Sequence, residues 1–162
     1  PLVAPGAPCS VVPEAQLLRL PADQVVVLTV VSYAFRLTLL IHFSPDPKTY
    51  AHFAAVNRLA LNGMGEQAFV DAISECGNIC CGNLNRELAR IFPHVGMSTP
   101  NILAHHCVAY LEQLGQGYRQ HFALQQANGP GFGISLCVNA FGPLDFEADF
   151  AAAEETGELQ MF

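Results

Sequence analysis

Apolar and polar residues alternate over positions 35–43. Phe35, Leu37, Leu39, Ile41 and Phe43 fall on one phase, and Arg36, Thr38, Leu40 and His42 fall on the other. A period of two predicts a β-strand with one face on a hydrophobic core. The β-branched run at 25–31 predicts a second strand before it. Residues 25–43 are almost continuously apolar, but Arg36 lies in the middle of this segment. A transmembrane helix needs about 20 apolar residues without charge, so the segment favours two buried strands over a membrane span.

Two later segments carry apolar residues at helical spacing. The first begins at Thr49 and stops at Asn62-Gly63, and the second spans about 66–91 and ends before Pro93, which cannot continue a helix. Apolar residues three or four apart form one stripe on the second helix, which we expect to face the sheet. The stripe comprises Phe69, Ile73, Cys76, Cys80, Leu84 and Leu88.

The second half of the chain is rich in strand signals. We predict a short strand at 95–99 and longer strands at 117–126 and 132–141, with a turn at 128–131 between the longer two. The segment 102–114 fits either irregular structure or a short helix. Strands, two helices and then strands predict an α+β fold, with two long helices packed on a mainly antiparallel sheet.

Length and composition favour one domain with a substantial core, since the chain has 162 residues and 51% of them are hydrophobic. We divide it into a proline-rich N-terminal arm at 1–21, a domain at 22–144 and an acidic C-terminal tail at 145–162. For the tail, both a loose helix over 146–153 and irregular structure stay open.

Charge and cysteine content narrow the class of protein. The formal net charge is -7 and there are only seven Lys and Arg, so the cationic surface that nucleic acids require is missing. Six cysteines do not imply disulfides in a chain with a large apolar core. No basic segment followed by an apolar one opens the sequence, so we expect no secretory signal, reduced thiols and a cytoplasmic location.

A second face of the long helix carries the candidate chemistry. Asp71, Glu75, Asn78 and Gly82 follow one another at steps of four, three and four residues. The Glu75 and Asn78 side chains therefore project side by side, one turn apart. A lone Glu-x-x-Asn pair is common on solvated helix faces, so the residues around it decide its interpretation.

Those surrounding residues resemble a known signature. Residues 71–83, D-A-I-S-E-C-G-N-I-C-C-G-N, resemble the D/S-x-x-x-E-x-x-N-x-x-x-G-N signature of the CheC/CheX/FliY chemotaxis phosphatase family. The segment M-S-T-P-N-I-L at 97–103 resembles the one that follows this helix in CheX-like members. The resemblance covers about 25–141, and the single Glu-x-x-Asn pair points to the CheX-like branch.

The resemblance implies a CheC-like α/β sandwich and a phosphatase of two-component or chemotaxis signalling. Such an enzyme hydrolyses the aspartyl phosphate of a CheY-like response-regulator receiver domain. Asn78 would align the attacking water and Glu75 would pair with a lysine of the receiver, while Asp71, Gly82 and Asn83 would contact the partner. The chain itself would bind no cofactor, since the receiver supplies Mg2+. CheX-like members commonly form homodimers, and sheet edges are the expected contact.

Two other classes stay open. One is a non-catalytic signalling adaptor of the same fold, related to flagellar-switch components. The other is a small-molecule or metal sensor, in which Cys76, Cys80 and Cys81 with His105-His106-Cys107 would form the metal site. The cysteine spacing argues against zinc, because Cys76 and Cys80 lie on the apolar stripe and no C-x-x-C pair exists. His42, His52, His94 and His121 are expected to be surface or hydrogen-bonded core histidines.

Overall fold

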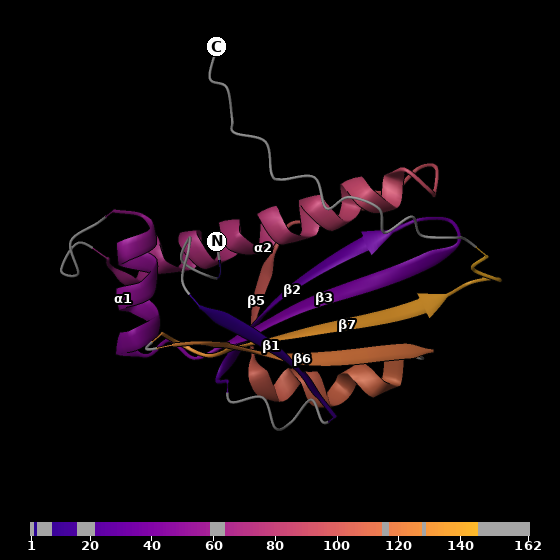
Figure 1. Cartoon of the computed structure of the whole chain (residues 1–162). Coiled ribbons are helices and arrows are strands. Elements are labelled where there is room, and N and C mark those ends of the chain that lie inside the picture. The colour runs from indigo at the N-terminus through magenta and orange to yellow at the C-terminus, as the bar shows by residue number, and fades with distance from the viewer. Residues whose placement is uncertain are drawn as a thin grey trace, which may run out of the picture.

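A computed structural model describes residue 2 and residues 8–15, 22–58, 64–114, 117–127 and 129–145. Its elements are β1 (Cys9–Glu14), β2 (Gln24–Val31), β3 (Phe35–Phe43), α1 (Pro47–Val56), α2 (Glu66–Ala89), β4 (Gly96–Met97), β5 (Asn101–Ala104), the 3-10 helix η3 (His105–Leu114), β6 (Tyr118–Gln126) and β7 (Phe132–Ala140). Figure 1 shows these elements and labels all of them except β4 and η3.

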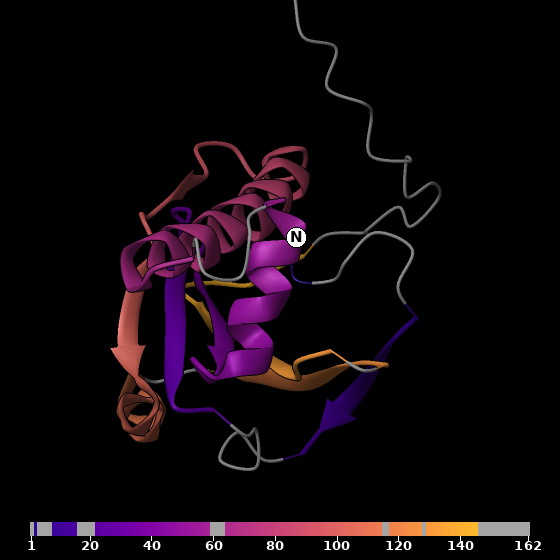
Figure 2. The ribbon, with the colours of Figure 1, turned by 90° about the vertical axis from the view of Figure 1, so that its left-hand side faces the viewer.

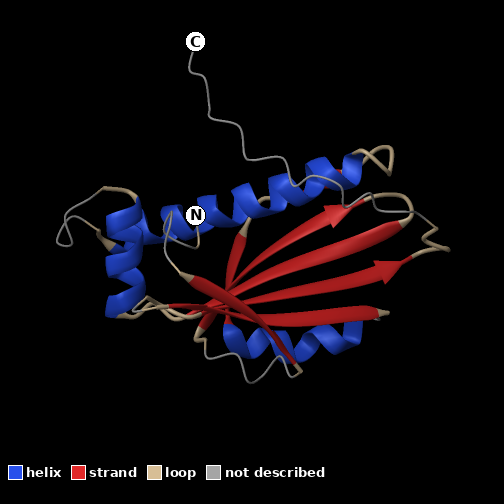
Figure 3. Cartoon of the chain, in the orientation of Figure 1, coloured by secondary structure: helices blue, strands red, loops and turns tan. Residues whose placement is uncertain are grey.

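The strands form one sheet with helices on it (Figure 3). The described strands pair in the order β1-β6-β7-β3-β2-β4, with β5 beside β2, and each of these pairings is antiparallel. The α+β class with a mainly antiparallel sheet is therefore confirmed. The strands predicted at 25–31, 117–126 and 132–141 are confirmed within one residue at each end.

The alternation along β3 separates two faces of the sheet. Val26, Leu28 and Val30 of β2 share the main core with the odd-numbered apolar residues of β3. The long helix α2 lies along this face, whereas η3 lies on the opposite side (Figure 1). Among the described residues, no helix is both long enough and apolar enough to cross a membrane.

The helix stripe is correct in its first half and shifts in its second. Phe69, Ile73 and Cys76 are buried as predicted, but Cys80 is only partly buried and Cys81 is fully buried beside it. Leu84 and Leu88 pack against the core while keeping some exposure. An α-helix completes one turn every 3.6 residues. Residues chosen in steps of three and four therefore shift gradually around the axis over a helix of 24 residues.

Gly77 allows α2 to approach the sheet closely. A Cβ atom at this position would lie 2.9 Å from Leu28 Cδ1 and 3.2 Å from Val26 Cγ1. Both neighbours are fully buried. A side chain at position 77 would therefore push the helix away from β2. Gly82, one turn and a half further along, would place a Cβ within 4 Å of nothing in the described chain.

The first helix is shorter than predicted. It begins where the Asp46 carboxylate accepts a hydrogen bond from the Thr49 backbone N–H at 2.8 Å, with Pro47 in the first turn. It ends at Val56, because Arg58 adopts a left-handed conformation with φ 56° that a helix cannot continue. The predicted stop at 62–63 lies outside the described residues. Among the α-helices of the described residues, only α2 is long, whereas two long helices were expected.

The remaining differences concern short elements. The short strand predicted at 95–99 is reduced to the two residues of β4. The segment 102–114, left open by the sequence, divides into β5 and η3. Residues 9–14 of the N-terminal arm form β1, which pairs with β6 at one edge of the sheet, far from β5 at the other (Figure 2). Except for Asp145, the tail lies outside the described residues.

A chain of histidines crosses the face opposite α2. The buried His42 ring contacts Ser135 Oγ through Nε2 at 2.8 Å and His105 Nε2 through Nδ1 at 3.1 Å. Ser135 Oγ also contacts His121 Nδ1 at 2.8 Å. Neutral rings satisfy every contact if each group donates to the next one in the order His105, His42, Ser135, His121. His42 is thus a hydrogen-bonded core histidine, as the sequence suggested.

Burial is the largest influence on the pKa values of these three histidines. Burial, together with the smaller effects of the neighbouring His105 and His121, lowers the pKa of His42 to about 3. Burial also lowers the pKa of His105, against the opposing effect of Asp23. For His121, burial and Arg119 lower the pKa while Glu14 opposes them. His42 therefore stays neutral in the folded protein.

We predict that replacing the two helix glycines by alanine has opposite effects on stability. Gly82→Ala gains helix propensity without a clash and should raise the free energy of unfolding by about 1 kcal/mol. Gly77→Ala gains the same propensity but overpacks the contact with β2, and should be less stable than Gly82→Ala by about 1–3 kcal/mol. Urea unfolding of both variants measures the difference. Equal stabilities would contradict the close approach.

We predict that His42 makes the fold sensitive to mild acid. Its pKa in the folded protein is about 3, against an ordinary value of 6.5, so below pH 6.5 the unfolded chain binds a proton that the folded one does not. This group should therefore lower the free energy of unfolding by up to about 1.4 kcal/mol for each unit that the pH falls from 6.5 toward 3.

Urea unfolding of wild type and His42→Gln between pH 7.5 and 5 isolates that contribution. The variant is expected to be less stable at pH 7.5 and to lose stability less steeply on acidification. His106→Gln, at an exposed neighbouring position, is the matched control. A His42→Gln profile parallel to that of wild type would show that His42 is not held neutral.

Candidate functional site

Glu75 and Asn78 lie together on the outer side of α2. Glu75 is exposed and Asn78 is half-buried. Asn78 Nδ2 donates a hydrogen bond to Glu75 Oε2 at 3.4 Å. The structure therefore brings the predicted carboxylate and carboxamide into contact, one turn apart, on the face where the sequence placed them.

The inner side of the same turns holds this pair in place. Ile73, Cys76 and Gly77 are buried against the sheet, and the exposed Glu75 lies between them in the sequence. The pair sits near the middle of a helix of 24 residues, away from both fraying ends. The backbone beneath the two polar groups is consequently fixed by core packing, and only their side chains are free to adjust.

The predicted flanking residues extend the face in both directions. Asp71 is exposed and accepts a hydrogen bond from Gln67 Nε2 at 2.9 Å. Asn83 is exposed and accepts one from Arg86 Nη2 at 2.9 Å. Between them, Gly82 leaves open space where a side chain would otherwise project. The face is accordingly polar at both ends, and no side chain protrudes from it at Gly82.

An apolar residue that the sequence analysis did not select belongs to this face. Ile79 follows Asn78 and is 47% exposed. The sequence feature that could have identified Ile79 is its position outside the apolar stripe. A large aliphatic residue on the outer side of a helix is exposed to water. Ile79 gives the face an apolar contact beside its polar pair.

The carboxylates of the face have no cationic partner within the described chain. The ion pair recorded among these residues joins Arg90 to Glu87 near the end of α2, at 2.9 Å. Glu75 and Asp71 are thus available to a cation on another molecule. A chain with net charge -7 would attract such a cation from a distance.

The cysteines of α2 are not brought together with the histidine segment. Cys76 packs in the core beneath α2, whereas Cys107 lies beside Val25 and Leu40 on the opposite face of the sheet. Burial raises the pKa of the thiols of Cys76, Cys80 and Cys81, which disfavours the thiolate that metals bind. Within the described ranges, no group of three or more His, Cys, Asp or Glu side chains is arranged to hold a metal ion.

The architecture defines a class of protein. Its arrangement of helices on an antiparallel sheet is similar to the fold of CheC-like and CheX chemotaxis proteins. The comparison with solved structures supports this assignment of the fold (probability 1.00 for each structure named below). No protein-family model and no curated protein matches the sequence.

Three of the similar structures illustrate the match. CheX from Vibrio vulnificus is 16% identical with a TM-score of 0.57, covering 80% of this chain and 86% of its own. A CheC-like superfamily protein from Shewanella sp. PV-4 is 13% identical with a TM-score of 0.56, covering 80% and 81%. The CheX-CheY-BeF3-Mg2+ complex from Borrelia burgdorferi is 11% identical with a TM-score of 0.60, covering 85% and 86%. The fold predicted by the resemblance is thereby confirmed.

Proposed function

We propose that this protein is a phosphatase that hydrolyses the aspartyl phosphate of a CheY-like receiver domain. The observation that carries the proposal is the contact between Glu75 and Asn78 on the exposed face of a rigid helix. The CheX-like fold supports it, as does the complex of the Borrelia burgdorferi CheX with CheY, BeF3 and Mg2+. No cofactor of this chain is required, because the receiver would supply the Mg2+.

The chemistry asked of this chain is the placement of one water molecule. Water attacks phosphorus, the bond from phosphorus to the aspartyl oxygen breaks, and the products are the free aspartate and inorganic phosphate. Asn78 offers an amide donor and a carbonyl acceptor, so its side chain can orient the water in line with the phosphoryl group. The receiver already holds the metal and the phosphate, so positioning is the missing component.

Glu75 would perform a different task. Its hydrogen bond with Asn78 is long at 3.4 Å and exposed, so breaking it on docking costs little. Glu75 could then turn to a lysine of the receiver and free the amide of Asn78 for the water. Docking and exposure of the catalytic amide would thereby be coupled through one weak contact.

The rest of the face fits a closely approaching partner. Gly82 removes a side chain from the line of contact, and the exposed Ile79 supplies apolar area beside the polar pair. Asp71 and Asn83 lie at the two ends as contacts to the partner. This is a small apolar patch with a polar rim, the arrangement usual for a protein interface.

We predict a separation of kinetic effects between the two residues. Asn78→Ala should lower turnover of a phosphorylated receiver by on the order of 100-fold with binding nearly unchanged, because the amide acts only in the transition state. Glu75→Ala should weaken receiver binding and make the residual activity less sensitive to salt, because an ion pair acts in the ground state as well.

Phosphate release from Mg2+-loaded, phosphorylated CheY-like receivers across salt concentrations measures both effects. The first receivers to test are those encoded beside this protein. Glu87→Ala, an exposed glutamate further along α2, is the matched control and should behave as wild type. Wild-type activity in Asn78→Ala would overturn the catalytic role of Asn78. Receiver binding without accelerated phosphate release by the wild-type protein would overturn the phosphatase and leave a non-catalytic adaptor.

We also propose that the protein forms a homodimer through a sheet edge. The two edges are β1 and the β4–β5 side, and an edge strand leaves backbone donors and acceptors unpaired. β1 carries the exposed apolar residues Val11 and Val12. The dimer would add strands to the sheet without covering the outer face of α2.

Light scattering at micromolar concentration is expected to give the mass of a dimer. Lysine disfavours edge-to-edge pairing, so one of Val11→Lys in β1 and Ala104→Lys in β5 should give a monomer and identify the edge. A wild-type monomer throughout this concentration range would refute the dimer. The proposed phosphatase activity of Asn78 does not require the protein to be a dimer.

A further inference from the structure

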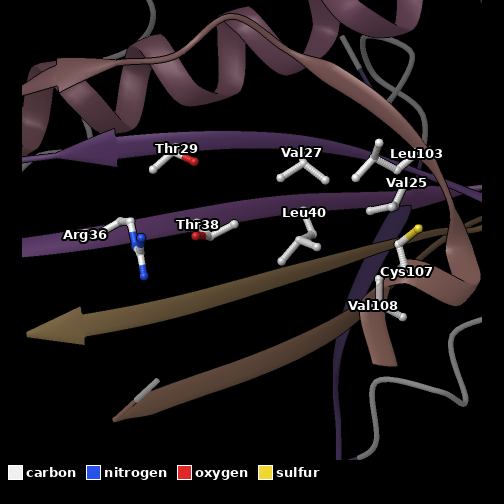
Figure 4. A pocket seen from close by; sticks show the side chains of 9 residues that line it. All are labelled: Val25, Val27, Thr29, Arg36, Thr38, Leu40, Leu103, Cys107 and Val108. Carbon is white, nitrogen blue, oxygen red and sulfur yellow. The ribbon is translucent and has the colours of Figure 1, made fainter. Parts of the chain in front are cut away.

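A trough runs over the face of the sheet opposite α2 (Figure 4). It has a volume of about 240 Å³. Its floor is formed by alternate residues of β2 and β3, and β5 and η3 form one wall. The lining residues are Val25, Val27, Thr29, Arg36, Thr38, Leu40, Leu103, Cys107 and Val108.

One end of the trough is apolar. Val108 of η3 is 2% exposed and packs with Val25, Leu40 and Cys137 in a cluster separate from the main core. Figure 4 shows Val108 and Cys107 at this end, level with Val25. Water in contact with such a surface is displaced favourably by hydrocarbon.

The other end is polar and carries one cation. Arg36 lies there, with the Thr29 and Thr38 side chains between it and the apolar end (Figure 4). Arg36 is half-buried, and no hydrogen bond or ion pair joins its side chain to any described residue. A partly buried guanidinium beside an apolar surface is stabilised by an anion that accepts its forked hydrogen bonds.

The distance between the two ends sets the size of a ligand. Thr29 lies four residues beyond Val25 on β2, and strands rise by roughly 3.3 Å per residue, so the apolar end lies about 13 Å from the threonines. Arg36 pairs with Val31, two residues further along, so its backbone lies roughly 20 Å from the apolar end. Its volume is below the range of about 300–1,000 Å³ usual for drug-sized molecules. A slender molecule with an anionic head and a short hydrocarbon tail fits both limits.

We propose that this trough binds a medium-chain monocarboxylate of roughly eight carbons. The carboxylate accepts hydrogen bonds from Arg36 at the open end, with the Thr29 and Thr38 hydroxyls nearby. The hydrocarbon chain runs over Val27 and Leu40 and ends against Val108. This site lies on the face of the sheet opposite Glu75 and Asn78, and is independent of the proposed phosphatase.

Titration of the full chain with octanoate tests the proposal. Calorimetry and the methyl resonances of valine and leucine report binding, and shifts are expected at Val25, Val27, Leu40, Leu103 and Val108. Octanol, which keeps the tail, and butyrate, which keeps the head, should each bind at least about 10-fold more weakly, because each lacks one half of the interaction.

Variants assign the two ends. Arg36→Gln should weaken octanoate at least about 10-fold and leave octanol unchanged, whereas Arg90→Gln, an ion-paired surface arginine on α2, should leave both unchanged. Val27→Phe fills the middle of the trough and should abolish binding, with folding verified by circular dichroism.

Three outcomes would overturn the proposal. The first is the absence of methyl shifts with millimolar octanoate. The second is octanoate binding that Arg36→Gln does not weaken. The third is a wild-type dimer that Arg36→Gln or Val27→Phe dissociates, which would show that a second copy of the chain covers this face. None of these outcomes bears on receiver dephosphorylation.

Discussion

The close contact between α2 and β2 is the constraint on which the rest of the structure depends. Gly77 lies within reach of Leu28 and Val26, at a distance that leaves no room for a Cβ. This contact fixes the height of the helix above the sheet and its rotation about its own axis. With Ile73 and Cys76 directed into the core, the same rotation turns Glu75 and Asn78 outward. The candidate site is thus a consequence of core packing.

The two faces of the sheet are stabilised in different ways. The face under α2 is a dry core of aliphatic and aromatic side chains, in which Phe53 and Phe69 pack edge to face with ring centroids 5.6 Å apart. The opposite face buries polar groups, and it can do so because His42 and Ser135 satisfy each other and their neighbours. Among the described residues, η3 covers part of this second face, and the trough that Arg36 lines lies beside it.

The site and the trough illustrate two ways of presenting polar groups. Glu75 and Asn78 stand on a convex helix surface, which suits a partner that brings its own concave active site. Arg36 stands at the end of a concave surface with an apolar floor, which suits a small molecule. The sheet separates the two, so that a ligand on one face need not obstruct a protein on the other.

The sequence by itself determined the strands with clear alternation, the long helix and the face that carries Glu75 and Asn78. These features follow from the local spacing of apolar and polar residues, which can be recognised without knowledge of the tertiary structure. It also supplied the resemblance to CheX-like proteins, which the fold confirms. It did not predict β1, because residues 9–14 lack alternation on a solvated edge and pair only with a strand more than a hundred residues away.

Only the tertiary structure decided the rest. The early end of α1, the exchange of Cys80 for Cys81 in the core, and the role of Gly77 depend on how the helices meet the sheet. The chain from His105 through His42 and Ser135 to His121 joins residues from four separate elements. The trough likewise combines side chains from β2, β3, β5 and η3. Such sets have no period in the sequence, because they are created by strand order and register, which non-local contacts decide.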